Sequence, residues 1–343
     1  MGLHEGMFAE NQKLTIDQQI EDMESKDIRF AEESDPEHCL LTKDNAKRFL
    51  KYNSYYYHLK HYADAFEVRR NASTKKYINV TFGKVVELSK LDMYLRKVIM
   101  HMCLDVEHVL KTRLMNDITI NPKEDGKCIV GLYLDDYTRY QAILCRKSGN
   151  SIVADLIERF PDSAEELPAW KFVEVLTFGE FIDFYTFYYD QYPEQQRNSY
   201  VYYLGNIRFL RNAAAHNACM LAKLRSKRKF DKTVKVMNAL SKIHVITGSK
   251  EYDYKRRMEN HVVHDFVTLL CVYHDLLDTG ANRSMLSREI DEIKGLFDPK
   301  TGRMCRHKEL FAGDNVIEKD YRFVWDLICY IDNRQHGKHK KIL

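Results

Sequence analysis

Residues 81–120 read TFGKVVELSKLDMYLRKVIMHMCLDVEHVLKTRLMNDITI, and this stretch decides the fold. Its apolar side chains recur at the three- and four-residue spacing of an α-helix, at Val85, Leu88, Leu91, Leu95, Val98, Met102, Val109 and Leu114. Pro122 follows and would end the helix, because proline lacks the backbone N–H that a helix needs. We therefore predict one long amphipathic helix here.

The composition extends the helical prediction to the whole chain. The sequence has 343 residues, of which 45% are hydrophobic, so it can bury a large core. Only 6 prolines and 14 glycines interrupt it, and both numbers are below average usage. Because these two residues make most tight turns, we predict an all-α fold.

Further helices are expected on both sides of residues 81–120. Helical spacing of apolar residues occurs at 14–27, 42–50, 137–145, 152–160, 170–185, 201–224, 252–277, 286–297 and 316–331. We divide the chain into an N-terminal helical segment at 1–45, a helical core at 46–230 and a C-terminal helical extension at 231–343. The extension is expected to pack on the core.

Charge, cysteines and the N-terminus narrow the class of protein. A formal charge of +3 is too small to indicate nucleic-acid binding by itself. The eight cysteines include no Cys-x-x-Cys pair, which favours reduced thiols over a disulfide framework or a zinc site. No apolar signal region opens the chain, and no apolar run approaches the ~20 residues that span a bilayer. We expect a soluble, cytoplasmic protein without a membrane partner.

The sequence Arg-Asn-Ala-Ala-Ala-His at 211–216 is the main candidate for chemistry. Asn212 and His216 are four residues apart and share a helix face, whereas Arg211 lies about 140° round the helix from His216. The guanidinium is permanently charged, and an imidazole gains or loses a proton near neutral pH. These two groups suffice to cleave RNA without a metal, if arginine length or a second subunit brings them onto one phosphate.

Two charged pairs on residues 81–120 are open to two interpretations. Asp92 with Arg96, and Glu107 with Lys111, are four residues apart and are expected on the outward face of the helix. Such pairs are commonly surface ion pairs, which contribute little to stability. The alternative is that Asp92, Arg96 or Glu107 supports a nearby active site.

A basic run follows the 211–216 motif. It contains Arg225, Lys227, Arg228, Lys229, Lys232 and Lys235, with few acidic residues between them. The run could be a solvated face or linker. It could equally be an RNA-binding strip formed chiefly by Arg225, Lys227, Arg228 and Lys229, since RNA affinity comes largely from lysine and arginine on phosphates. Both interpretations stay open.

Residues 51–66 carry six aromatic side chains, Tyr52, Tyr55, Tyr56, Tyr57, Tyr62 and Phe66. Such side chains can stack on RNA bases, but aromatic residues at helical spacing more often fill a core, and we predict a core role. The pairs His58 with His61 and His261 with His264 lack the further ligands of a zinc site. The nucleotide-binding and serine-hydrolase motifs are also missing, so no metal and no cofactor are expected.

Several short segments occur in a fixed order along the first two-thirds of the chain. They are 14–20 (LTIDQQI), the tyrosine-rich 51–66, 81–82 (TF), 91–96 (LDMYLR), 107–113 (EHVLKTR), 176–180 (LTFGE) and 210–217 (LRNAAAHN). This order resembles the abortive-infection (Abi) family of bacterial phage-defence proteins, of the AbiD/AbiF type. That family in turn resembles the HEPN superfamily of all-helical domains.

The HEPN signature is an arginine, commonly followed by a polar residue such as asparagine, with a histidine a few residues on. Arg211, Asn212 and His216 fit it. The resemblance implies a HEPN-type helical bundle with additional N- and C-terminal helices. Because HEPN ribonucleases bring two motifs into one cleft and this chain has one, it also implies a homodimer.

The resemblance implies a toxin-like endoribonuclease that acts in antiviral defence. His216 would exchange protons with the ribose 2′-OH and the leaving 5′-oxygen, Arg211 would hold the phosphate charge, and Asn212 would orient the imidazole or a phosphate oxygen. RNA is the expected substrate. Restraint is expected from a regulatory noncoding RNA, an antitoxin protein or a phage-derived trigger.

The alternative is a non-catalytic helical protein that binds RNA or a protein partner. In that interpretation Arg211, Asn212 and His216 bridge helices at a dimer seam, and the imidazole has only a structural hydrogen bond.

Overall fold

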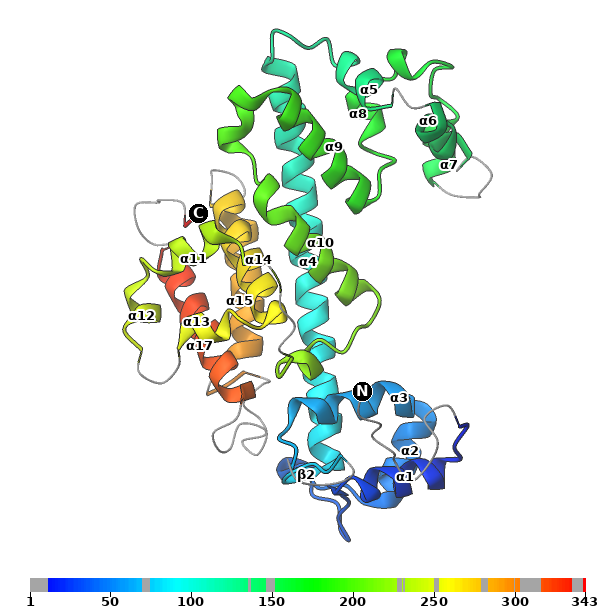
Figure 1. Cartoon of the computed structure of the whole chain (residues 1–343), viewed down its shortest axis with the longest axis vertical. Helices are drawn as coiled ribbons and strands as arrows, with labels where there is room; N and C mark the ends of the chain where they lie inside the picture. Colours follow the sequence, from blue (N-terminus) through cyan, green and yellow to red (C-terminus); the bar gives the residue numbers. More distant parts are fainter. Residues whose placement is uncertain are drawn as a thin grey trace. The chain divides into compact units, whose positions relative to one another are not determined.

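The computed structural model describes residues 12–69, 75–134, 137–145, 152–226, 230, 232–249, 253–278, 283–298, 300–302, 316–334 and 342–343. Over these residues the regular structure is almost entirely helical (Figure 1). The sheet in this part has two parallel strands, β1 (Ile28–Arg29) and β2 (Val80–Thr81), with Ile28 opposite Val80. The predicted all-α class is confirmed apart from this short pairing.

The chain forms two compact units. Unit 1 combines Met1–Met102 with Leu210–Leu343, and unit 2 is Cys103–Phe209. Two helices, α4 (Phe82–Ile120) and α10 (Val201–Ala215), contribute residues to both units. The division at residues 45 and 230 stays a prediction.

Helix α4 confirms the long helix predicted from residues 81–120. It has 39 residues and ends at Ile120, shortly before Pro122. The predicted apolar stripe is buried at every position, namely Val85, Leu88, Leu91, Leu95, Val98, Met102, Val109 and Leu114. The apolar periodicity therefore identified the side of the helix that faces the core.

The N-terminal part of unit 1 consists of α1 (Ile16–Ser25), η1 (Pro36–His38), α2 (Lys43–Tyr52), α3 (Tyr56–His61) and η2 (Tyr62–Ala65). Side-chain caps set the starts of α1 and α2. The Thr15 hydroxyl accepts from Gln18 N at 3.3 Å, and the Thr42 hydroxyl accepts from Asn45 N at 3.3 Å. Each cap satisfies a backbone donor that the first helical turn leaves without a partner.

The prediction that the aromatic residues of 51–66 form a core is wrong for half of them. Tyr62 is fully buried, but Tyr52, Tyr55 and Tyr57 are 73%, 65% and 68% exposed. Helix α3 has only six residues, so no continuous helix face directs the neighbouring tyrosines inward. Consecutive tyrosines then point to different sides.

The C-terminal part of unit 1 contains η6 (Leu221–Lys223), α11 (Val234–Leu240), α12 (His244–Thr247), α13 (Tyr254–Arg257), α14 (His261–Leu277), α15 (Arg283–Phe297) and α17 (Val316–Arg334). Stacked rings of Phe266, Phe297 and Tyr321, with centroids 6.0 Å apart in each pair, join α14, α15 and α17. The single helix predicted at 252–277 is wrong. Asn260 caps a new helix there, since its side chain accepts from Val262 N and Val263 N.

Unit 2 contains α5 (Cys128–Tyr133), α6 (Tyr137–Leu144), α7 (Ile152–Ile157), η4 (Ala164–Glu166), α8 (Ala169–Phe172), α9 (Phe178–Gln191) and η5 (Pro193–Asn198). The helix predicted at 170–185 is divided into α8 and α9. Thr177 and Glu180 form a capping box that starts α9, with the Glu180 carboxylate accepting from Thr177 N at 2.8 Å.

Two whole-chain predictions can be compared with the described residues. No helix among the described residues combines the length and the apolar character that crossing a membrane requires. Their cysteines are all free thiols, in agreement with the interpretation of the cysteine spacing.

Candidate functional site

Helix α10 ends at the motif. Its last helical residue is Ala215, and His216 is the C-cap, with its N–H still donating to Asn212 O at 3.0 Å. Asn217 adopts a left-handed conformation with φ of 53°, and Ala218 N donates to Ala213 O at 2.9 Å. These are the features of a Schellman motif, which closes a helix and reverses the chain direction. The prediction that the helix continues to residue 224 is therefore wrong.

The three motif side chains lie at the surface of this helix end. His216 is exposed, whereas Arg211 and Asn212 are half-buried. The Arg211 guanidinium donates to the Asn212 side-chain oxygen at 3.2 Å. Asn212 therefore contacts the arginine, and its predicted role toward the imidazole stays a prediction. The imidazole is open to solvent, as a group that exchanges protons with a substrate must be.

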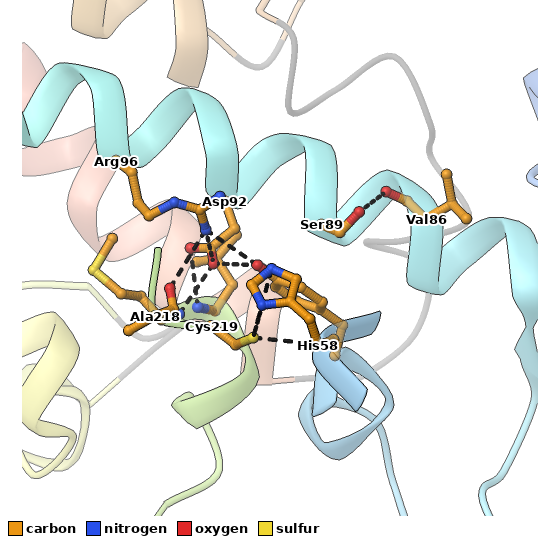
Figure 2. A network of polar contacts seen from close by, with 10 residues as sticks. His58, Val86, Ser89, Asp92, Arg96, Ala218 and Cys219 are labelled. Carbon is orange, nitrogen blue, oxygen red and sulfur yellow. Dashed lines mark hydrogen bonds and ion pairs between the residues drawn. The ribbon is translucent and has the colours of Figure 1, made fainter. Parts of the chain in front are cut away.

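Asp92 fixes the backbone that follows the motif. Its carboxylate is fully buried and accepts from Met220 N at 3.0 Å and Leu221 N at 3.2 Å. The Tyr62 hydroxyl and the Arg96 guanidinium also donate to it, at 2.6 and 2.7 Å. Figure 2 shows Asp92 and Arg96 projecting from α4 toward the segment at Ala218 and Cys219. A buried carboxylate needs such donors, because it has lost its hydration.

Arg96 extends this network. Besides the Asp92 bond, its guanidinium donates to the Tyr62 hydroxyl at 3.1 Å and to Ala218 O at 3.4 Å. The i,i+4 pairing of Asp92 with Arg96 is confirmed, but its predicted outward position is wrong, since both residues are buried. The segments η2 and η6, which pack on each other, supply Tyr62 and Leu221 to this network.

Burial raises the pKa of two groups in the Asp92 network, Asp92 and Tyr62. Burial raises the pKa of Asp92, while the bonds from Tyr62 and the charge of Arg96 act in the opposite direction. The same burial, together with Asp92, raises the pKa of the Tyr62 hydroxyl, which stays a donor. We therefore assign this network to the positioning of the Ala218–Leu221 backbone.

His58 and Cys219 form a second contact to the same segment. The Cys219 sulfur lies 3.3 Å from His58 Nδ1 (Figure 2). Burial raises the pKa of the Cys219 thiol, and burial with the charge of Arg96 lowers the pKa of His58. Both shifts favour the neutral groups, whereas a cysteine nucleophile needs a thiolate beside a charged imidazole. The pair links α3 to the segment after the motif.

The sequence interpretation did not identify His58, Tyr62 and Cys219 as members of one network. The signal available was the four-residue spacing of His58 and Tyr62, which puts both on one helix face. Their partners are far away in the chain, so local spacing could not reveal the network.

Glu107 and Arg225, the other predicted site residues that the structure describes, have partners of their own. Glu107 belongs to unit 2 and pairs with Lys111 at 2.9 Å, both side chains being half-buried. Arg225 is half-buried and its Nε donates to Ala65 O at 2.9 Å, so part of the guanidinium has a structural partner. Lys227, Arg228 and Lys229 lie outside the described residues. The RNA-binding strip and the supporting role of Glu107 stay predictions.

The histidine pairs weighed as metal ligands have other contacts. His264 accepts from Thr233 N at 3.0 Å through Nε2, and its Nδ1 lies 3.1 Å from the Asp265 carboxylate. His61 lies 3.7 Å from Asp64. Both histidines thus have structural partners in the described part of the chain.

The comparisons with known proteins confirm the Abi-like part of the resemblance. The model of a family described as Abi-like protein matches residues 48–222, which include Asp92, Arg96 and the 211–216 motif. The chain matches no curated protein and no solved structure. Because the matched residues make up just over half of the sequence, the chain belongs to the Abi-like protein family, and this membership implies a part in abortive-infection phage defence.

Proposed function

We propose that the protein is a HEPN-type endoribonuclease that cleaves RNA without a metal ion. The observation that supports this most is the end of α10, where an exposed imidazole follows a half-buried guanidinium. The Schellman closure and the buried Asp92 network hold the backbone on both sides of His216. A site on such fixed backbone keeps its groups in reacting geometry.

The residue types suit transesterification at phosphorus. A neutral imidazole takes the proton of the ribose 2′-OH as the 2′-oxygen attacks phosphorus. The bond from phosphorus to the 5′-oxygen breaks, and the same imidazole, now protonated, gives that oxygen the proton. Arg211 stabilises the negative charge that builds on the phosphate oxygens. The products carry a 2′,3′-cyclic phosphate and a 5′-OH, so DNA is not cleaved.

A homodimer completes the site in this proposal. Each chain carries one Arg-Asn-x-x-x-His motif in the sequence, and the partner brings its Arg211 guanidinium to the phosphate on which His216 of the first chain acts. An unrestrained ribonuclease would be lethal to its host. We therefore include a restraint, from an antitoxin protein or a noncoding RNA, that infection releases.

The test is incubation of purified protein with end-labelled RNA in excess EDTA. We expect cleavage by the wild type, no cleavage of DNA of the same sequence, and a loss of about 10²–10⁴-fold in rate for His216→Ala. His108→Ala is the matched control, because it removes an exposed imidazole of α4 far along the sequence from the motif. It should cleave as the wild type does.

The competing function is RNA binding without cleavage. It predicts that wild type and His216→Ala both shift the mobility of intact RNA and release no cyclic phosphate. That result would reject the ribonuclease proposal.

A further inference from the structure

A histidine and two glutamates from distant parts of the sequence meet within unit 1. His101 belongs to α4, and Glu289 and Glu292 belong to α15. One ligand atom from each residue, an imidazole nitrogen or a carboxylate oxygen, lies within 4.8 Å of the other two. The two glutamates are one helical turn apart, so their carboxylates share a helix face.

The burial of these three side chains differs in a way that suits an ion site. Glu289 is 2% exposed, whereas His101 and Glu292 are exposed. A carboxylate out of water is costly, and a second carboxylate one turn away adds like-charge repulsion. Arg288, whose side chain is 63% exposed, donates to one Glu289 oxygen at 3.3 Å. A divalent cation would neutralise both carboxylates at once.

We propose that His101, Glu289 and Glu292 bind a divalent metal ion, with Zn²⁺ as the best fit. One imidazole nitrogen and two carboxylate oxygens are ligands that zinc accepts, and three protein ligands leave a fourth position for water. The exposed His101 and Glu292 give the ion a path from solvent. Calcium and magnesium fit less well, because they prefer oxygen ligands alone.

The ion would join two parts of the protein that the sequence keeps apart. His101 lies inside the range that the family model matches, whereas α15 lies after its end at residue 222. A ligand that binds only the folded state stabilises it by an amount that grows with the logarithm of its concentration over its dissociation constant. The metal therefore stabilises the packing of α15 on α4 and takes no part in RNA cleavage.

The test is calorimetric titration of the full-length, EDTA-dialysed protein with ZnCl₂ and, separately, MnCl₂. We expect one tight site per chain and a metal-dependent rise in melting temperature. His101→Ala and Glu292→Gln should each weaken binding by more than about tenfold. Both changes are at exposed positions, so the variants should fold, and circular dichroism without metal checks this.

His108→Ala and Asp291→Asn are the matched controls. They change an exposed histidine of α4 and an exposed carboxylate of α15 outside the cluster. Both should bind the metal as the wild type does. Dependence on His101 and Glu292 for the binding of Mn²⁺ alone would support the site and change its metal. The proposal is overturned if no ion binds, or if His101→Ala and Glu292→Gln bind as tightly as the controls. Neither result depends on ribonuclease activity.

Discussion

At the scale of one residue, Asp92 accepts hydrogen bonds from four donors and so fixes the backbone that follows the motif. Asp92→Asn keeps the shape but removes the charge opposite the buried Arg96 guanidinium, and its amide group cannot accept from all the donors. We expect the free energy of unfolding to fall by about 3–5 kcal/mol, because an uncompensated charge is left in the interior. Urea unfolding measures this change.

Glu107→Gln is the comparison for Asp92→Asn. It also breaks an i,i+4 ion pair of α4, but the side chains of Glu107 and Lys111 are half-buried and reach solvent. We expect a loss below about 1 kcal/mol. Equal losses in the two variants would contradict the assignment of Asp92 as an interior anchor.

For Asp92, the sequence predicted the ion pair but not the burial. Its pairing with Arg96 followed from their spacing, and the structure confirms it. Its burial did not follow, because two of its four donors are the backbone amides of Met220 and Leu221, which come 128 and 129 residues later in the chain. An interpretation from periodicity assigns a polar residue to the protein surface when the nearby sequence offers no buried partner for it.

At the scale of an element, the end of α10 depends on the conformation of Asn217. Its φ of 53° is tolerated by asparagine and glycine but strained for other side chains. We expect Asn217→Ala to lower the free energy of unfolding by about 1 kcal/mol, while Asn217→Gly leaves it unchanged or slightly higher. Urea unfolding of both variants separates the outcomes. Equal effects would mean that the left-handed turn does not close the helix.

The link between α3 and the segment after the motif should respond to pH. Burial and the nearby Arg96 and His61 charges lower the pKa of His58, so the folded chain binds fewer protons than the unfolded chain below about pH 6.5. Acidification from about pH 7 to about pH 5 therefore favours unfolding. Because His58→Gln lacks this effect, its free energy of unfolding should fall less over the same interval. Parallel pH profiles for the two proteins would contradict the shift.

Elements differed in how far the sequence predicted them. The stripe and the end of α4 followed from periodicity and Pro122, because many turns repeat one signal. The end of α10 did not, because Ala218–Leu224 continues the apolar pattern while Asn217 reverses the chain. The divisions at Thr177 and Asn260 were missed for the same reason, since one capping side chain outweighs the local pattern.

At the scale of the whole molecule, the sequence indicated one motif and therefore a second copy of the chain. The helical class could be predicted from local spacing, and the Abi-like family from the order of short segments along the chain. The meeting of His101 with α15, and of Asp92 with residues 220–221, could not, because both are set by packing between distant segments. The proposed dimer lies beyond a single chain and requires its own experiment.

Mixing two inactive variants tests the dimer. If Arg211 of one protomer and His216 of its partner act on the same phosphate, Arg211→Ala and His216→Ala are each inactive alone. A dimer with one chain of each kind still holds one intact guanidinium and one intact imidazole in the shared cleft. We therefore expect the mixed, unfolded and refolded variants to recover RNA cleavage that neither has alone. Light scattering of the wild type should show a dimer. A monomer that cleaves RNA, or a dimer without complementation, would confine the reaction to groups of one chain.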